Sequence, residues 1–256
     1  MRVLSRLVAL PVLVALGVAA CGSHAPGADD AEGGPTGALT VLAAASLRDA
    51  FERLRGVFED EHPGVTVTFA FAGSSTLAQQ VLAGAPADVL ATASTPTMAL
   101  VGDLADEPVV VARNTLEIVV PVDNPAGITS LADLADPGVT LALCAPEVPC
   151  GAAAADAFAA AGITPTPDTY EKDVTAALTR AVLGEVDAAL VYRTDVLAAG
   201  ESVRGIPLPD DVRSSTDYPV AVLTEAPNPD AARAFVALVR SAQGRQVLTE
   251  AGFEVP

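Results

Sequence analysis

Three serines stand where the sequence predicts that a strand passes into a helix. Ser46 follows the apolar run 39–45, and Ser74 and Ser75 follow the alternating run 65–71. The first N–H groups of a helix lack intrahelical partners and carry partial positive charge. A serine hydroxyl beside them adds a rotatable donor, so such a junction can bind an anion without lysine or arginine. Ordinary N-capping is the default explanation of a single such serine, so one junction is weak evidence, and spacing alone does not show whether the junctions converge.

The same serines lack the partners of a hydrolytic site. The histidines are His24 and His62, and His62 lies in a predicted turn with Pro63 and Gly64. The chain has no G-x-S-x-G, P-loop, G-x-G-x-x-G or metal-spaced carboxylate motif. The chain therefore has too few histidines for a histidine-rich zinc site, and no suitable partner residues for a histidine-dependent triad. The sequence predicts a protein that is not an enzyme and that uses no cofactor.

Composition narrows the possible partners further. The chain has 256 residues, 51% of them apolar, and a formal net charge of −18 from 32 acidic and 14 basic residues. This charge argues against nucleic-acid binding, because phosphate contacts need a positive face. Aromatic residues make up only 4% and tryptophan is absent, so stacking on bases is poorly provided for. The length suggests one large or two small domains.

The first 38 residues are not expected to belong to the fold. A positively charged start and the apolar run 7–20, which is too short to span a membrane, predict a signal peptide at 1–20. The run ends in Val18-Ala19-Ala20-Cys21, which resembles a bacterial lipobox whose cysteine is lipidated. Residues 21–38 are rich in Gly, Pro, Ala and Asp and predict a flexible tether. The alternative is an ordinary signal peptide with a chance cysteine.

From residue 39 onward the predicted elements alternate between strands and helices. Strands are predicted at 39–45, 65–71, 88–91, 115–121, 139–144, 187–192 and 218–224. Helices are predicted from Leu47 to the turn at Pro63, from Ser74 to about Gly84, near Met98, at Leu131–Ala135, from Gly151, near Asp173 and around Phe235. Repeated βα units imply an α/β fold whose mixed, mainly parallel sheets are flanked by helices on both faces.

Seven segments then resemble a known family. They are AAASL (43–47), FAGSSTLAQQVLAGAPADV (71–89), APEVPCG (145–151), DVTAAL (173–178), VDAALVYRTD (186–195), YPVAV (218–222) and AGFEVP (251–256). In this order they are similar to segments of the periplasmic molybdate-binding proteins, the ModA-type solute-binding components of ABC importers. The resemblance covers the chain from about residue 39 to its end.

The resemblance implies a two-lobe type II solute-binding fold with the ligand cleft between the lobes. We expect lobe one at 39–114 and 217–256, and lobe two at 115–216. In the family a tetrahedral oxyanion is held by neutral hydroxyls and backbone amides. Carried over, the ligand-binding positions are Ser46, Ser74, Cys150, Val174 and Tyr192, with the last three drawn from the EVP, DV and LVY segments.

The residues themselves are compatible with these implied positions. Four of them fall at or near a predicted helix start, where amide donors are free, and Tyr192 ends a predicted strand, where ligands of open α/β sheets usually bind. Without the resemblance, the alternative role of Tyr192 is a buried core tyrosine whose hydroxyl is satisfied locally. Val174 is expected to contribute only its N–H.

Cys144 and Cys150 flank a proline-containing loop six positions apart. In an exported protein such a pair is expected to form a disulfide, which would hold the Cys150 amide in place. Two free buried thiols are the alternative. Many relatives carry a small residue such as alanine at the position of Cys150, but a contact through the backbone N–H does not need that side chain.

The function implied is binding of molybdate or tungstate and delivery to the membrane permease of an ABC importer. The protein is expected to be a monomer, lipid-anchored to the outer face of the cytoplasmic membrane, and not to bind nucleic acid. Carriers of sulfate, phosphate or an organic ligand, a lipoprotein hydrolase and a scaffold lipoprotein are the alternatives. Phosphate recognition benefits from an acceptor in the site, and none of the five positions is acidic, which favours a fully deprotonated oxyanion.

Overall fold

The computed structural model describes residues 34–212 and 214–256, and residues 34–256 form one compact unit. The predicted signal peptide, Cys21 and most of the predicted tether lie outside the described residues. Within them, no helix is both long enough and apolar enough to span a lipid bilayer.

The first stretch of the unit alternates strands and helices. Its elements are β1 (Gly37–Ala44), α1 (Arg48–Glu61), β2 (Val65–Ala72), α2 (Ser74–Leu82), β3 (Val89–Ala91) and α3 (Thr95–Ala99). A 3₁₀ turn, Ala45–Leu47, joins β1 directly to α1. The predicted apolar face of α1 is correct: Phe51, Leu54 and Phe58 are fully buried.

The second stretch begins with the long strand β4 (Ala105–Pro121), which leads to a short 3₁₀ helix (Leu131–Ala135). The elements that follow are β5 (Leu141–Cys144), α4 (Pro149–Ala161), β6 (Thr169–Glu171), α5 (Val174–Val182), β7 (Ala188–Tyr192), α6 (Arg193–Ala199) and β8 (Val203–Pro207). The chain ends with β9 (Ser215–Leu223), α7 (Pro229–Arg240) and α8 (Ala242–Glu250).

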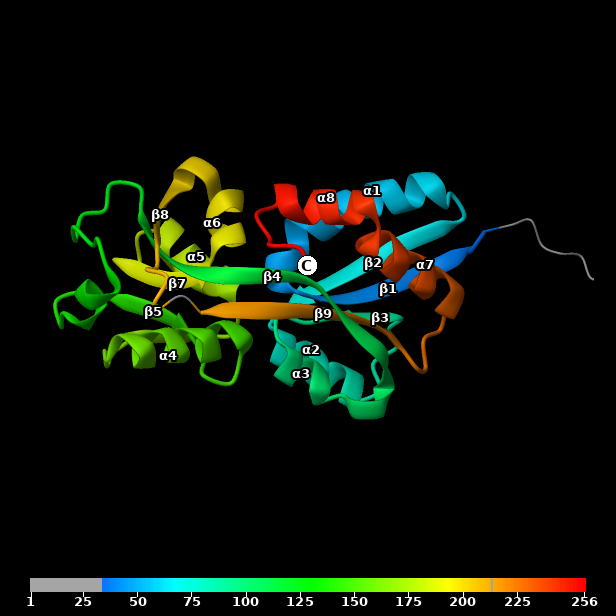
Figure 1. Cartoon of the computed structure of the whole chain (residues 1–256), viewed down its shortest axis with the longest axis horizontal. Coiled ribbons are helices and arrows are strands. Elements are labelled where there is room, and N and C mark those ends of the chain that lie inside the picture. Colours follow the sequence, from blue (N-terminus) through cyan, green and yellow to red (C-terminus); the bar gives the residue numbers. More distant parts are fainter. Residues whose placement is uncertain (1–33, 213) are drawn as a thin grey trace, which may run out of the picture. The chain divides into compact units, whose positions relative to one another are not determined.

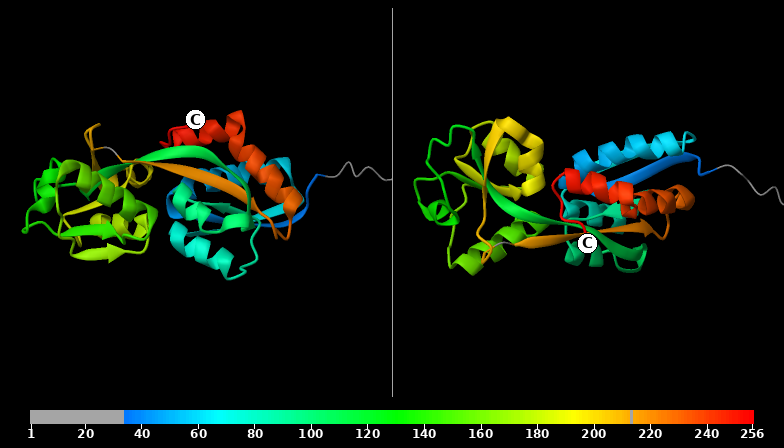
Figure 2. Two further views of the ribbon diagram at one scale, coloured as in Figure 1. Left: turned by 60° about the horizontal axis from the view of Figure 1, so that its bottom comes forward. Right: turned by 45° about the horizontal axis from the view of Figure 1, so that its top comes forward.

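The strands form two groups joined by two long strands. The order is β2-β1-β3-β9-β4-β7-β5-β6, and β8 also pairs with β4. Pairing is parallel between β1 and its neighbours β2 and β3, and between β5 and its neighbours β6 and β7. It is antiparallel wherever β4 or β9 takes part. Figure 1 shows β4 and β9 side by side between the two groups, as do the views in Figure 2.

Helices cover both faces of the first group of strands. Leu39 and Val41 of β1 pack with the α1 and α7 aromatics, including Phe51 and Phe235, in the main core. Leu42, on the opposite face of β1, packs with residues of α2 and α3 in a second, smaller core. Because both faces are buried there, the inner strands β1 and β3 contain near-continuous apolar runs, whereas the edge strand β2 alternates between buried and exposed positions. The predicted α/β fold with flanked, mixed sheets is confirmed.

Strand β4 is much longer than the predicted strand 115–121. It already begins at Ala105, and its pairing with β9 is interrupted by register shifts near Val109 and Ala112. Glu107, next to Pro108, has a positive φ of 40°. This irregular, charged first half lacks the strict alternation of a regular strand, so hydrophobic patterning detects only its second half.

Candidate functional site

One cavity brings together side chains from both groups of strands. Its lining includes all five positions implied by the sequence, namely Ser46, Ser74, Cys150, Val174 and Tyr192. Ser46 and Ser74 follow β1 and β2 in the first group, whereas the other three follow or end strands of the second group. The volume of the cavity is about 20 Å³. This space suits one small ion and is far below the roughly 300–1,000 Å³ of pockets for drug-sized ligands.

The first turns of three long helices line this cavity. Ser74 and Val174 are the first residues of α2 and α5, and Cys150 is the second residue of α4. The 3₁₀ turn that contains Ser46 precedes α1. Backbone N–H groups at these starts have no intrahelical acceptor, and the helix dipoles add positive potential there. The cavity therefore offers converging donors without a cationic side chain.

At α4 the geometry singles out one N–H group. Pro149 has no N–H, and the N–H groups of Gly151 and Ala152 both donate to the Val148 carbonyl at 3.0 Å. Within the described residues this leaves the Cys150 N–H as the donor at the helix start. At α5 the Asp173 side chain accepts from the Ala176 N–H at 2.9 Å, which leaves the N–H groups of Val174 and Thr175 at the helix start. Of these two residues only Val174 lines the cavity.

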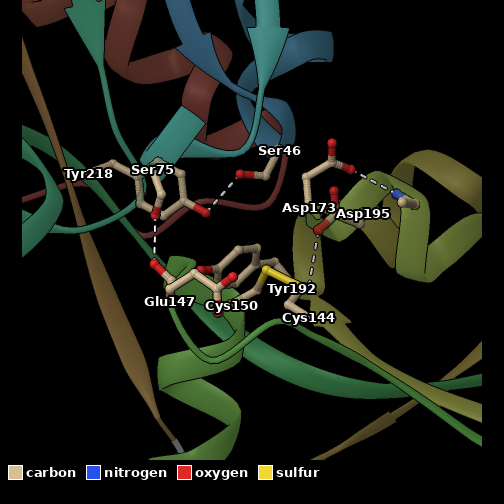
Figure 3. Close-up of a disulfide and its surroundings, with 10 residues drawn as sticks. Ser46, Ser75, Cys144, Glu147, Cys150, Asp173, Tyr192, Asp195 and Tyr218 are labelled. Atoms are coloured by element: carbon tan, nitrogen blue, oxygen red, sulfur yellow. Dashed lines mark hydrogen bonds between the residues drawn. A yellow bond between two sulfur atoms is a disulfide. The ribbon is translucent and has the colours of Figure 1, made fainter. Parts of the chain in front are cut away.

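Three hydroxyls supplement the amides. Ser74, only 2% exposed, accepts from the Ala93 N–H at 2.9 Å, so its own proton remains available to donate. Ser46 Oγ lies 2.8 Å from the Tyr218 hydroxyl (Figure 3). The Tyr192 hydroxyl is buried and forms no hydrogen bond with the described residues. Burial raises the pKa of Tyr192 above its usual value, which Thr216 and Tyr218 offset only partly, so the phenol stays a donor.

A disulfide joins the end of β5 to the start of α4. Cys144 and Cys150 are bonded, with their Cα atoms 5.7 Å apart (Figure 3). The bond closes the loop that carries Glu147, and in the chain-entropy picture a loop this short gains about 2 kcal/mol of stability. Gly151 is required there, because a Cβ atom on it would lie 2.0 Å from the Ala145 carbonyl oxygen. The disulfide thus tethers the α4 start that presents the Cys150 N–H.

The cavity lining carries one charged side chain, and it is acidic. Asp173 lines the cavity and caps α5, while the described lining contains no lysine or arginine. No three His, Cys, Asp or Glu side chains of the described residues gather closely enough to hold a metal ion. Attraction for an anion must therefore come from hydrogen bonds donated by amides and hydroxyls, and the low local dielectric strengthens these interactions.

A second carboxyl, Asp195, is buried behind the site. It is 7% exposed and accepts from the Tyr192 N–H at 3.0 Å. Burial raises the pKa of Asp195 to about 7, and the charges of Asp49 and Asp173 push in the same direction. The Tyr192 N–H opposes the shift.

This shift predicts a pH dependence of stability. Between pH about 4 and pH about 7 the folded state holds a proton on Asp195 that the unfolded state has released, so the free energy of unfolding decreases as pH rises. Asp195→Asn, which keeps an oxygen acceptor for Tyr192, should flatten this decrease in urea titrations between pH 4.5 and 7.5. Asp123→Asn, at an exposed carboxylate, serves as the control. An unchanged slope in Asp195→Asn would show that Asp195 titrates normally.

Contacts across the cavity join the two groups of strands. The Ser75 hydroxyl donates to the Glu147 carbonyl oxygen at 2.6 Å (Figure 3). Gly73, just before α2, lies so close to the segment between β6 and α5 that a Cβ atom on it would be 2.5 Å from the Lys172 carbonyl oxygen. These contacts hold the α2 start against the opposite wall of the cavity.

Sequence reasoning missed three residues of this region. Asp173 was expected only as the approximate start of a helix, although its place before a helical pattern is typical of an N-cap. Tyr218 belongs to a segment of the resemblance, but its contact with Ser46 spans 172 positions, and no local pattern predicts it. Gly73 precedes the first serine of the FAGSS segment, and its close approach to Lys172 is visible only in three dimensions.

Comparisons by sequence give a consistent set of relatives. A family model described as bacterial extracellular solute-binding protein matches residues 39–254. The molybdate-binding protein ModA of Mycobacterium tuberculosis (strain ATCC 25618 / H37Rv) is 43% identical over 250 residues, 95% of each chain. A putative ABC transporter substrate-binding lipoprotein, YvgL of Bacillus subtilis (strain 168), is 28% identical over 227 residues, 84% of this chain and 85% of its own.

Solved structures show the same fold. The periplasmic molybdate-binding protein of Azotobacter vinelandii matches with a TM-score of 0.75 at 18% identity, covering 85% of this chain and 99% of its own. The sulfate-binding protein SubI of Mycobacterium tuberculosis H37Rv also matches with a TM-score of 0.75, at 19% identity over 85% of this chain and 86% of its own. Since proteins for two different anions match equally well, the fold alone does not select the ligand.

Proposed function

Because this chain belongs to the family of bacterial extracellular solute-binding proteins, we propose that it binds molybdate or tungstate and delivers the ion to the permease of an ABC importer. The 43% identity to a molybdate-binding protein supports this choice of ligand. In this proposal the protein releases the ion unchanged and performs no catalysis. It needs no resident cofactor.

The observation that carries the proposal is the convergence of donors on one small cavity. Helix starts of both strand groups and the hydroxyls of Ser46, Ser74 and Tyr192 line a space of about 20 Å³. A tetrahedral dianion accepts hydrogen bonds in all directions, which suits donors that arrive from all sides. Each charge-assisted hydrogen bond in such a site contributes about 1.5–3 kcal/mol.

We further propose that the two groups of strands are lobes that close on the ion. Lobe one comprises 39–114 and 217–256, and lobe two comprises 115–216. The long strands β4 and β9, which cross between them, would act as the hinge. The hydrogen bond from Ser75 to Glu147 would form on closure. Closure excludes water and thereby strengthens every hydrogen bond to the anion.

Residues 1–38 support a proposal about location. A signal peptide at 1–20, lipidation at Cys21 and a tether at 21–38 would anchor a monomer to the outer face of the cytoplasmic membrane. The lipobox-like Val18-Ala19-Ala20-Cys21 supports the anchor. A tether of this length would leave the cleft free to meet the permease.

Substitutions that separate hydroxyl from amide donors test the proposed binding mode. Ser46→Ala and Ser74→Ala each remove a hydroxyl at the cavity and should weaken molybdate binding about tenfold or more, because 1.4 kcal/mol corresponds to a factor of ten. Val174→Ala keeps the N–H that we assign to the ligand, and its affinity should stay within about threefold of wild type. Calorimetric titration with molybdate measures all three.

Ser74→Ala also deprives the Ala93 N–H of its acceptor and could therefore lower stability. Melting temperatures measured without ligand separate this loss of stability from a loss of binding. Wild-type affinity in both serine variants, or a loss in Val174→Ala that exceeds theirs, would contradict the assignment of these donors.

A further inference from the structure

Tyr218 of β9 lies directly behind the cavity. The residue is fully buried and is not part of the cavity lining. Its hydroxyl is 2.8 Å from Ser46 Oγ, and its ring packs edge-on against Tyr192 and Phe253, with centroids 5.9 and 5.1 Å apart. Figure 3 shows the hydroxyl pointing at Ser46. Tyr218 thus contacts Ser46, a candidate ligand-binding residue, from the side that faces away from the cavity.

The neighbours of Tyr218 determine which way its hydrogen bond runs. Asn114 Oδ1 accepts from the Thr115 N–H at 3.0 Å, and since an N–H can only donate, this end of the amide must be the oxygen. The other end, Asn114 Nδ2, lies 2.8 Å from Thr194 Oγ1 and 3.4 Å from the Tyr218 hydroxyl. Nδ2 can only donate, so the Tyr218 oxygen accepts from it.

A phenol that accepts from Asn114 has its own proton free for Ser46. Of the two hydrogen-bond partners described for the Tyr218 hydroxyl, Ser46 Oγ and Asn114 Nδ2, only Ser46 can accept the buried phenol proton. We therefore assign Tyr218 O–H as the donor to Ser46 Oγ, which leaves the Ser46 proton free to point into the cavity. Burial raises the pKa of Tyr218 well above its usual value, so the phenol keeps its proton. The chain of hydrogen bonds from Asn114 through Tyr218 to Ser46 thus has one direction and ends in a donor at the site.

We propose that Tyr218 is a positioning residue that fixes the Ser46 hydroxyl as a hydrogen-bond donor to the bound oxyanion. The inference rests on the proposed function and adds a reason for selectivity. A ligand oxygen that carries a proton accepts a hydrogen bond from Ser46 less strongly than a charged oxygen does, and its own proton would face the Ser46 proton. The arrangement favours a fully deprotonated oxyanion over a protonated one such as hydrogen phosphate.

A double-mutant cycle between Tyr218 and Ser46 tests this role. Tyr218→Phe removes the hydroxyl and keeps the ring packing, so the fold should persist, which melting temperature checks. With Ser46 present, Tyr218→Phe should weaken molybdate binding about fivefold or more. In a Ser46→Ala background, where no hydroxyl remains to be oriented, the same change should alter affinity less than twofold. Such coupling is the signature of two residues that act through each other.

A second variant changes the residue at the other end of the hydrogen-bond chain. Asn114→Ala removes the donor that orients Tyr218, and its effect should likewise depend on Ser46. Tyr170→Phe, at an exposed tyrosine, is the matched control for loss of a phenol. Unchanged molybdate affinity in Tyr218→Phe, or an equal loss with and without Ser46, would overturn the positioning role. Wild-type protein that does not bind molybdate would instead overturn the proposed function, whatever the variants do.

Discussion

Replacing Tyr192 with phenylalanine is expected to weaken molybdate binding about 10- to 100-fold while leaving the protein at least as stable as wild type. Tyr192 is 1% exposed and lines the cavity, and its buried hydroxyl has no hydrogen-bond partner among the described residues. An unpartnered buried hydroxyl costs stability, and a bound anion would convert this cost into a charge-assisted hydrogen bond. A substitution that weakens molybdate binding without lowering stability identifies a hydroxyl that serves binding and not folding.

Calorimetric titration gives the affinity of Tyr192→Phe, and thermal melting without ligand gives its stability. The ring remains, so its edge-on packing against Tyr218 persists. Tyr170→Phe, at a tyrosine that is 57% exposed, should change neither quantity. If Tyr192→Phe bound molybdate like wild type, the hydroxyl would not reach the ligand and the proposed donor set would be wrong.

Gly73→Ala should weaken molybdate binding to a similar extent, about 10- to 100-fold, by a different route. The Gly73 backbone has φ −60° and ψ 134°, which alanine adopts without strain. The added Cβ would, however, lie 2.5 Å from the Lys172 carbonyl oxygen across the cavity. Overpacking of this kind costs about 1–3 kcal/mol. If the lobes close as proposed, that cost would fall only on the closed arrangement, and the equilibrium should shift towards an open one.

Small-angle scattering with and without molybdate distinguishes this mechanism from a lost donor. The wild type should become more compact when molybdate is added, and Gly73→Ala should do so only at higher concentration. Gly56→Ala is the matched control, because a Cβ atom there has no neighbour within 4 Å. Wild-type affinity in Gly73→Ala would show that the close approach to Lys172 is not needed for binding.

The secondary structure could largely be predicted because local rules agree with the fold. Alternating and continuous apolar runs give most strands, and β1, β2 and β7 lie within two residues of their predicted bounds. The start of α4 was placed at Gly151, two residues too late, because Pro149 reads as a loop residue although it is favoured at the first position of a helix. The short β6 and β8, α6 after β7 and α8 after α7 were not predicted, since three to nine residues carry little periodic signal.

The candidate site could be predicted only in part. Strand-to-helix junctions in the sequence indicate where backbone N–H groups are free to donate. Only the family resemblance implies which of these N–H groups face the ligand. Residues that act through long-range packing leave no local pattern. The Gly73 approach to Lys172 and the Asn114–Tyr218–Ser46 chain depend on how β4, β9 and the helix starts meet in space. Such contacts can be found only in the folded structure.

The central claim, that this cavity selects a fully deprotonated tetrahedral oxyanion of molybdate size, is tested most directly by calorimetric titration with four ions. Molybdate and tungstate should bind with similar, high affinity, because both are tetrahedral dianions of nearly equal size. Sulfate and hydrogen phosphate should bind much more weakly, by about 100-fold or more, which corresponds to a difference of about 2.7 kcal/mol. Equal affinities for sulfate and molybdate would contradict the account.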